Sequence, residues 1–148
     1  MIFAVDNILS PMTKKLFIPL LACIALFGCN DDKKQEQTLL NDVIKTHDKL
    51  MVDDGAIMKS KMQLKAITTA NTAADVKDSV AIYAKLLDDA DNSMMSWMNK
   101  FSPDFTGKTH EQIITYLTTQ KAEILKIDSQ INITLAKSNS YISKNKAK

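Results

Sequence analysis

Two short segments of the chain contain the residues whose types and spacing could do chemistry. His47 and Met51 are four residues apart, as are Met94 and Met98, and Trp97 lies beside Met98. In a helix, a spacing of four places both side chains on one face. Imidazole and thioether groups are borderline or soft ligands that suit Cu(I), and an indole ring can shield the ion through a cation–π contact. These residues therefore form a candidate Cu(I) site, with His47, Met51, Met94 and Met98 as ligands and Trp97 as the shield.

Two other interpretations of the same residues stay open. Methionine fills irregular gaps between packed helices, so the cluster could instead be core or a partner-binding surface, with His47 hydrogen-bonded within it. Met/His ligation in a helical bundle also resembles that of b-type haem proteins. However, the chain has no Cys-x-x-Cys-His motif and one helix too few for that arrangement. Haem is therefore the weaker cofactor candidate.

Three amphipathic segments must position these residues. Apolar side chains recur at three- and four-residue steps over 38–68, 72–101 and 109–137, which predicts three helices. Capping boxes are expected at Thr72 and Thr109, and a kink or break at Gly55. Short connectors make neighbouring helices antiparallel, so the predicted fold class is all-α: an up-down-up antiparallel three-helix bundle over 38–137. A polar tail over 138–148 is expected to fray. The second segment has an almost unbroken heptad seam, made of Val76, Val80, Tyr83, Leu87, Ala90, Met94, Trp97 and Phe101.

Folding the first two segments into a hairpin brings the candidate ligands together. The turn is expected to centre near residues 70–71, which puts His47 opposite Met94. Met51 and Met98 each lie one turn away on the same faces, and Trp97 lies beside them. The sequence thus predicts that all five side chains meet at the end of the bundle nearer the N-terminal leader.

The N-terminal segment has the pattern of a bacterial export signal. Lys14 and Lys15 precede an apolar stretch over 16–27 that is too short to span a bilayer comfortably. It ends in Leu-Phe-Gly-Cys at 26–29, which resembles the lipobox of bacterial lipoproteins, whose cysteine carries lipid. We therefore expect a leader and signal peptide over 1–28, with Met12 as the true start, then a lipidated Cys29 and a polar tether over 29–37. Simple secretion and a membrane anchor are the alternatives. Lipidation would place the domain in the cell envelope, facing the periplasm or the cell surface.

The two ligand-bearing segments also resemble a known group of proteins. His47 to Met51 fits the pattern H-D-x-x-M, and Ser93 to Met98 fits S-M-M-x-W-M. Both are similar to motifs of small uncharacterised bacterial lipoproteins that often carry the label "viral A-type inclusion protein" repeat. The resemblance covers the lipobox and most of the chain after it. It implies a lipoprotein, and it brings no established activity with it.

Composition and the remaining polar residues exclude several function classes. The net charge is only +2 and the chain lacks arginine, so we expect no nucleic-acid partner. No nucleophile–base–orienter set is visible, so we expect no enzyme. His110 lies in the second capping box, where solvation explains it, and the acidic run at 88–91 is expected to be a solvated helix face. The expected partners are the bilayer, through the acyl chains on Cys29, and an unknown protein, with a homodimer as a further option.

Overall fold

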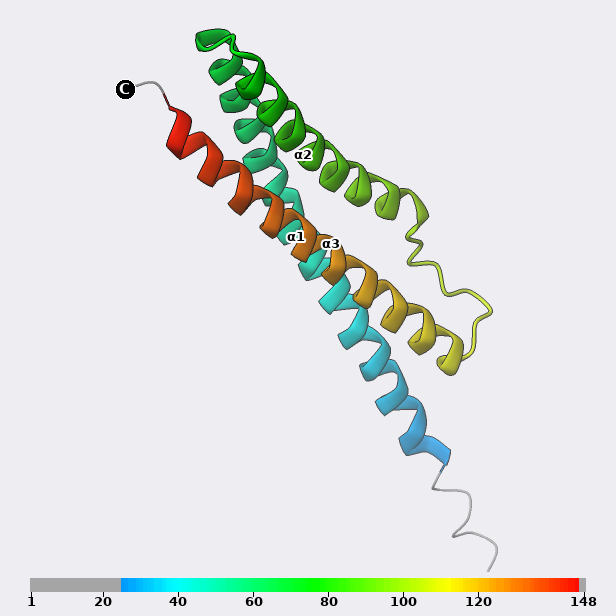
Figure 1. Cartoon of the computed structure of the whole chain (residues 1–148). Coiled ribbons are helices and arrows are strands. Elements are labelled where there is room, and N and C mark those ends of the chain that lie inside the picture. The colour runs from blue at the N-terminus through cyan, green and yellow to red at the C-terminus, as the bar shows by residue number, and fades with distance from the viewer. Residues whose placement is uncertain (1–24, 147–148) are drawn as a thin grey trace, which may run out of the picture.

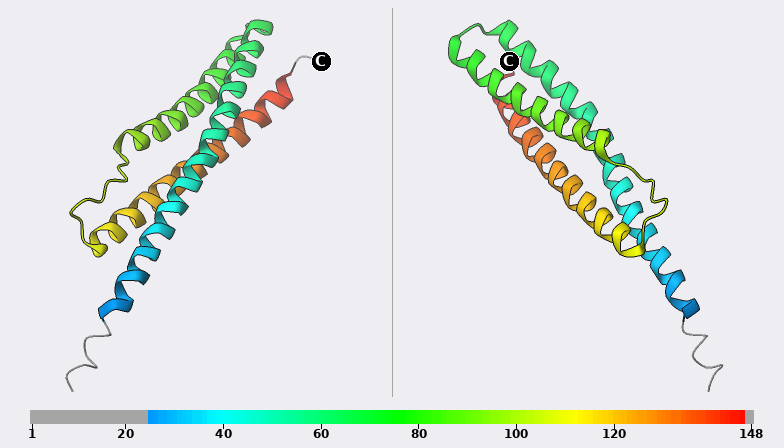
Figure 2. Two further views of the ribbon diagram at one scale, coloured as in Figure 1. Left: turned by 180° about the vertical axis from the view of Figure 1, so that it is seen from behind. Right: turned by 90° about the vertical axis from the view of Figure 1, so that its right-hand side faces the viewer.

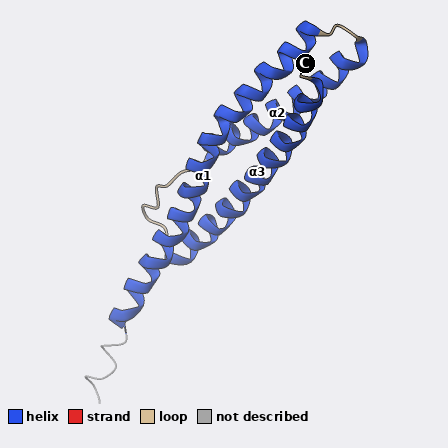
Figure 3. Cartoon of the chain, turned by 90° about the vertical axis from the view of Figure 1, so that its left-hand side faces the viewer, coloured by secondary structure: helices blue, strands red, loops and turns tan. Residues whose placement is uncertain are grey.

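The chain folds into three long helices. The computed structural model describes residues 25–146, with side chains from Asn30 onward. Helix α1 spans Ala25–Ala70, α2 spans Ala74–Lys100 and α3 spans His110–Asn145, with connectors over 71–73 and 101–109 (Figure 1). Helices α1 and α3 run in the same direction and α2 runs against both (Figure 3). The predicted all-α, up-down-up three-helix bundle is confirmed. In the described residues, none of the helices contains an apolar stretch long enough to cross a membrane.

The core follows a seven-residue repeat on all three helices. Such a repeat keeps one apolar seam facing the partner helices, as in coiled coils. The predicted seam of α2 is confirmed: most of its members are buried, and Val76, Tyr83 and Phe101 pack against the buried cluster. The buried positions that show the repeat are Val43, Leu50, Ile57 and Leu64 on α1, Val80, Leu87 and Met94 on α2, and Leu117, Ile124, Ile131 and Ser138 on α3.

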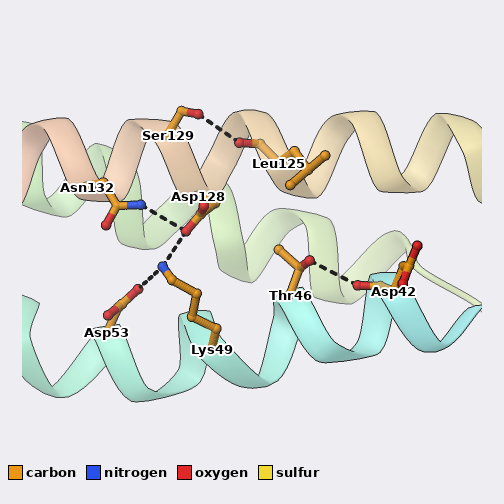
Figure 4. Close-up of polar contacts among 8 residues, drawn as sticks. All are labelled: Asp42, Thr46, Lys49, Asp53, Leu125, Asp128, Ser129 and Asn132. Carbon is orange, nitrogen blue, oxygen red and sulfur yellow. Dashed lines mark hydrogen bonds and ion pairs between the residues drawn. The ribbon is translucent and has the colours of Figure 1, made fainter. Parts of the chain in front are cut away.

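Polar contacts fix the register between α1 and α3. Lys121 Nζ donates to Asp42 Oδ2 at 2.6 Å, Lys49 Nζ donates to Asp128 Oδ1 at 2.6 Å, and Ser60 contacts Asn139 at 3.1 Å. The two partners are 79 residues apart in each case. A constant offset is what two parallel helices in continuous contact must show. Figure 4 shows the middle contact, where Lys49 bridges Asp53 of its own helix and Asp128 of α3.

Helix α1 is longer and more regular than the sequence suggested. Residues 30–37, expected to be a polar tether, are helical, and the helix continues through Gly55 without a break. Leu50 and Ile57 on either side of Gly55 are fully buried. Their packing outweighs the roughly 1 kcal/mol that an internal glycine costs a helix. Of the leader and signal peptide expected over 1–28, residues 1–24 lie outside the described residues, as does the side chain of Cys29.

Two helix ends also differ from expectation. The capping box at Thr109 is present: the Thr109 hydroxyl accepts from the backbone N–H of Gln112, and the Gln112 side chain accepts from the backbone N–H of Thr109. The box at Thr72 is absent, because α2 begins one residue later, with Ala73 as an N-cap that has no side-chain acceptor. Helix α3 continues to Asn145, with Ile142 buried against the other helices, so the first part of the expected polar tail belongs to the bundle.

The connector between α2 and α3 is long, and it sets the relative heights of the helices. His110, at the start of α3, lies beside Glu36 of α1, with His110 Nδ1 2.8 Å from Glu36 Oε1. Helix α2 ends much further along α1, where Trp97 lies next to His47. Between Glu36 and His47, α1 therefore runs beside α3 without α2, and the first turns of α1 project beyond both helices, as Figure 2 shows. The predicted ligand cluster consequently lies in the middle of the molecule, at the point where α2 ends.

Candidate methionine-lined site

A cavity of about 360 Å³ lies between α1 and α2, over Ile131 of α3. Three of the four predicted ligands, Met51, Met94 and Met98, line it together. Two further methionines, Met58 and Met95, complete a lining with five thioethers. We call this space the methionine cavity; its remaining lining residues are Leu50, Asp54, Ile57, Asp91 and Ile131.

The methionines run from the floor of this cavity to its rim. Met94 is a core residue with 6% of its surface exposed, whereas Met51 is 47% and Met58 and Met95 are each 52% exposed. The helix period explains the grouping, because residues 91, 94, 95 and 98 share one face of α2 and residues 51, 54 and 58 share one face of α1. Met94 belongs to the buried seam of α2, and the other residues of both faces flank the seam. The result is a row of thioethers that is anchored inside the bundle and open to solvent.

Two carboxylates line the same space. Asp54 of α1 and Asp91 of α2 contribute to the wall, one from each helix. Neither forms an ion pair within residues 30–146, although neighbouring carboxylates do: Lys61 pairs with Asp88 and Lys85 pairs with Asp89. The acidic run at 88–91 is therefore only partly a solvated surface. The Lys61 ammonium, which pairs with Asp88, also attracts Asp54 and Asp91 and offsets part of their charge. Because three carboxylates share this one ammonium, the wall of the cavity keeps a negative charge that favours a cationic occupant.

His47 does not line the methionine cavity. Its ring lies beside the Trp97 ring, with the centroids 6.1 Å apart, and its Nδ1 is 3.1 Å from Asp48 Oδ1. The expectation that His47 faces Met94 is therefore wrong by about one helical turn along α2. The reason is the position of the hairpin connector, which spans 71–73 and so lies slightly later than the expected turn at 70–71. Each residue of α1 therefore faces a residue of α2 that is later in the sequence than expected. His47 still lies one turn from Met51 on α1, so it is adjacent to the cavity.

Trp97 belongs to the core and not to the wall of the methionine cavity. It is buried and stacks on Phe101, with ring centroids 4.9 Å apart, and Phe101 stacks in turn on Tyr116 of α3 at 6.1 Å. Its Nε1 is buried without a hydrogen-bond partner among the described residues. Trp97 also borders a second, more polar space of about 490 Å³ between α2 and α3. The expected shield thus lies beside the thioether row, between it and α3.

His110, expected to be solvated, is instead part of an interhelical contact. Its Nδ1 is 2.8 Å from Glu36 Oε1 and its Nε2 is 3.5 Å from Asp32 Oδ1. Because each ring nitrogen meets a different carboxylate, this arrangement holds the start of α3 to α1. Within residues 30–146, no three His, Cys, Asp or Glu side chains form a group that could hold a metal ion.

Fold and site together define a three-helix bundle with an open, methionine-lined cavity between its first two helices. Comparison with protein-family models, with curated proteins and with solved structures finds no match for this chain.

Proposed function

We propose that this chain is a non-enzymatic lipoprotein, held in the cell envelope through Cys29, that binds a soft monovalent metal ion such as Cu(I) in the methionine cavity. One observation carries the proposal: Met51 from α1 and Met94 and Met98 from α2 line a single cavity. The lipobox and the similarity to small bacterial lipoproteins support the proposed location in the cell envelope.

The chemistry of the lining suits such an ion. Thioether sulfur is a soft ligand, prefers Cu(I) to hard cations and is not lost to protonation at low pH. Methionine has three rotatable bonds, so the exposed Met51, Met58 and Met95 can adjust toward the buried Met94. Asp54 and Asp91 add the negative charge that draws a cation to the opening.

A titration with Ag(I) as a stable Cu(I) substitute tests the proposal. Purified residues 30–148 contain a single tryptophan, so the fluorescence of Trp97 reports on events one turn away from Met94. We expect tight saturable binding that is weakened in Met94→Leu and unchanged in Met62→Leu. Met62 is a suitable control because it is also a methionine of α1 but lies outside the methionine cavity. No response at micromolar Ag(I) would refute the metal proposal.

A second candidate function is an interaction or structural lipoprotein, and one observation favours it. A separate cavity of about 410 Å³, which shares Met58 with the methionine cavity, lies between α1 and α2 and is lined by Met62, Leu64, Val80 and Ala84 among others. Methionine-rich grooves are typical of surfaces that bind helical partners. Absence of Ag(I) binding together with a dimer mass by light scattering would support a second copy as the partner. An absorbance scan of the protein isolated from cells tests haem.

A further inference from the structure

The contact between His47 and Asp48 determines which ring nitrogen of His47 is available to a metal. Nδ1 of His47 lies 3.1 Å from Asp48 Oδ1. An ionised carboxylate can only accept a hydrogen bond, so Nδ1 must carry the proton when the imidazole is neutral. The lone pair is then on Nε2, at the other side of the ring from Asp48.

Nothing else in the described chain competes for this carboxylate. Asp48 is exposed and forms no ion pair with a lysine within residues 30–146. The next residue, Lys49, donates to Asp53 and Asp128 instead, which fixes its ammonium group away from Asp48. Asp48 is therefore free to orient the half-buried ring of His47, which packs against Trp97 on the side of the bundle interior.

We infer that Asp48 is a positioning residue that holds the His47 ring, beside Trp97, in the tautomer whose Nε2 is free to bind a metal ion. Ligating histidines commonly donate their second N–H to a carboxylate, which fixes the tautomer and raises the basicity of the ligating nitrogen. His47 precedes Met51 by four residues and lies on the same face of α1. The imidazole therefore lies one helical turn from Met51, outside the lining of the methionine cavity. The role of His47 as a ligand rests on the proposed function, but the tautomer of its ring can be measured in the absence of metal.

Long-range ¹H–¹⁵N NMR of the full chain, as isolated from the cells that express it, measures the tautomer directly. When the ¹⁵N shifts show the His47 ring to be neutral, we expect the ring to carry its proton on Nδ1. Asp48→Ala should shift the population toward the Nε2–H form. Asp78→Ala is the matched control, because Asp78 is an exposed helical aspartate that contacts neither His47 nor His110 within residues 30–146. A wild-type His47 protonated on Nε2 would overturn the inference.

A double-mutant cycle, read out by Ag(I) affinity, tests whether Asp48 supports metal binding through His47. We expect Asp48→Ala to weaken Ag(I) binding by about tenfold, as loss of a carboxylate behind a ligating histidine commonly does, and Asp78→Ala to leave it unchanged. In a His47→Ala background, Asp48→Ala should have no further effect. If the loss persists without His47, Asp48 acts through charge alone and the inference is wrong, while the proposed function stands. If the wild-type chain binds no Ag(I), both are wrong.

Discussion

Replacing Met94 by leucine or by alanine separates the packing role of this side chain from its role as a ligand. Met94 is the one methionine of the cavity that is buried in the core, so both roles fall on the same residue. Leucine keeps the volume and the apolar surface but removes the sulfur. Alanine removes both. The two substitutions therefore differ in their effect on stability and agree in their effect on metal binding.

The structure sets the size of each stability effect. Burying a methionine side chain contributes about 1.5–3 kcal/mol, and Met94 is almost fully buried. Met94→Leu conserves volume and should cost less than about 1.5 kcal/mol. Met94→Ala should cost about 2–3 kcal/mol, at the lower end of the range for such truncations. The reason is that the space vacated by alanine joins the existing 360 Å³ cavity instead of forming a new enclosed void.

Urea unfolding followed by far-UV circular dichroism measures the stability, and Ag(I) titration measures the affinity. We expect both variants to lose at least about tenfold in affinity, equivalent to about 1.4 kcal/mol, because one of the converging sulfur ligands is gone. Met62→Leu should match the wild type in both assays. A Met94→Leu protein that binds Ag(I) as tightly as the wild type would show that Met94 only packs the core.

Three further predictions concern the scaffold, each measured by urea unfolding. Gly55→Ala should raise the free energy of unfolding by about 0.5–1 kcal/mol, because a Cβ there meets open space in a continuous helix; a decrease would indicate that α1 does break there. Thr109→Ala should lower it by about 1 kcal/mol through loss of the capping box, and an unchanged value would mean that water replaces the cap. Lys49→Met should lower it by about 1 kcal/mol or less, because the ammonium group is half exposed. Hydrogen bonds to Asp128 and Asp53 raise the pKa of Lys49 above its ordinary value. The stabilisation by this contact is therefore fully present below the ordinary lysine pKa and disappears as the pH rises through the raised value. The difference between wild type and Lys49→Met should shrink in that alkaline range, and a difference that stays constant would exclude the ionic origin.

The fold could be predicted because the spacing of the apolar residues determines both the helices and the faces that they bury. The seam of α2 is regular over its whole length, and its members are buried or pack on the core as expected. The errors lie where tertiary contacts decide. Residues 30–37 are polar, but Glu36 contacts His110 and the helix extends through them. The end of α3 is polar by composition, yet Ile142 packs on the core. Neither contact can be read from local sequence alone.

The site was only partly predictable, for a related reason. Reasoning from the heptad seam finds Met94, which occupies a seam position, but it passes over Met58 and Met95, which flank the seam. A signal for Met58 was present, since it lies seven residues after Met51 and so returns to the same face of the helix. The position of His47 depended on the hairpin turn, where a shift of one or two residues moves the facing residue by a full turn.

Exposure of the methionines is the strongest argument against core packing as the whole explanation of the cluster. The interior at this level is already filled by aliphatic side chains, with Leu50, Ile57 and Leu87 fully buried. Core packing accounts for Met94, but Met51 and Met95 have about half of their surface in solvent, where a lysine or glutamate would serve solubility better. Flexible thioethers held around an open cavity contribute little to stability. They are suited to binding an occupant of the cavity. The carboxylates of Asp54 and Asp91 in its wall, whose charge Lys61 offsets only in part, favour a cation over a neutral apolar molecule.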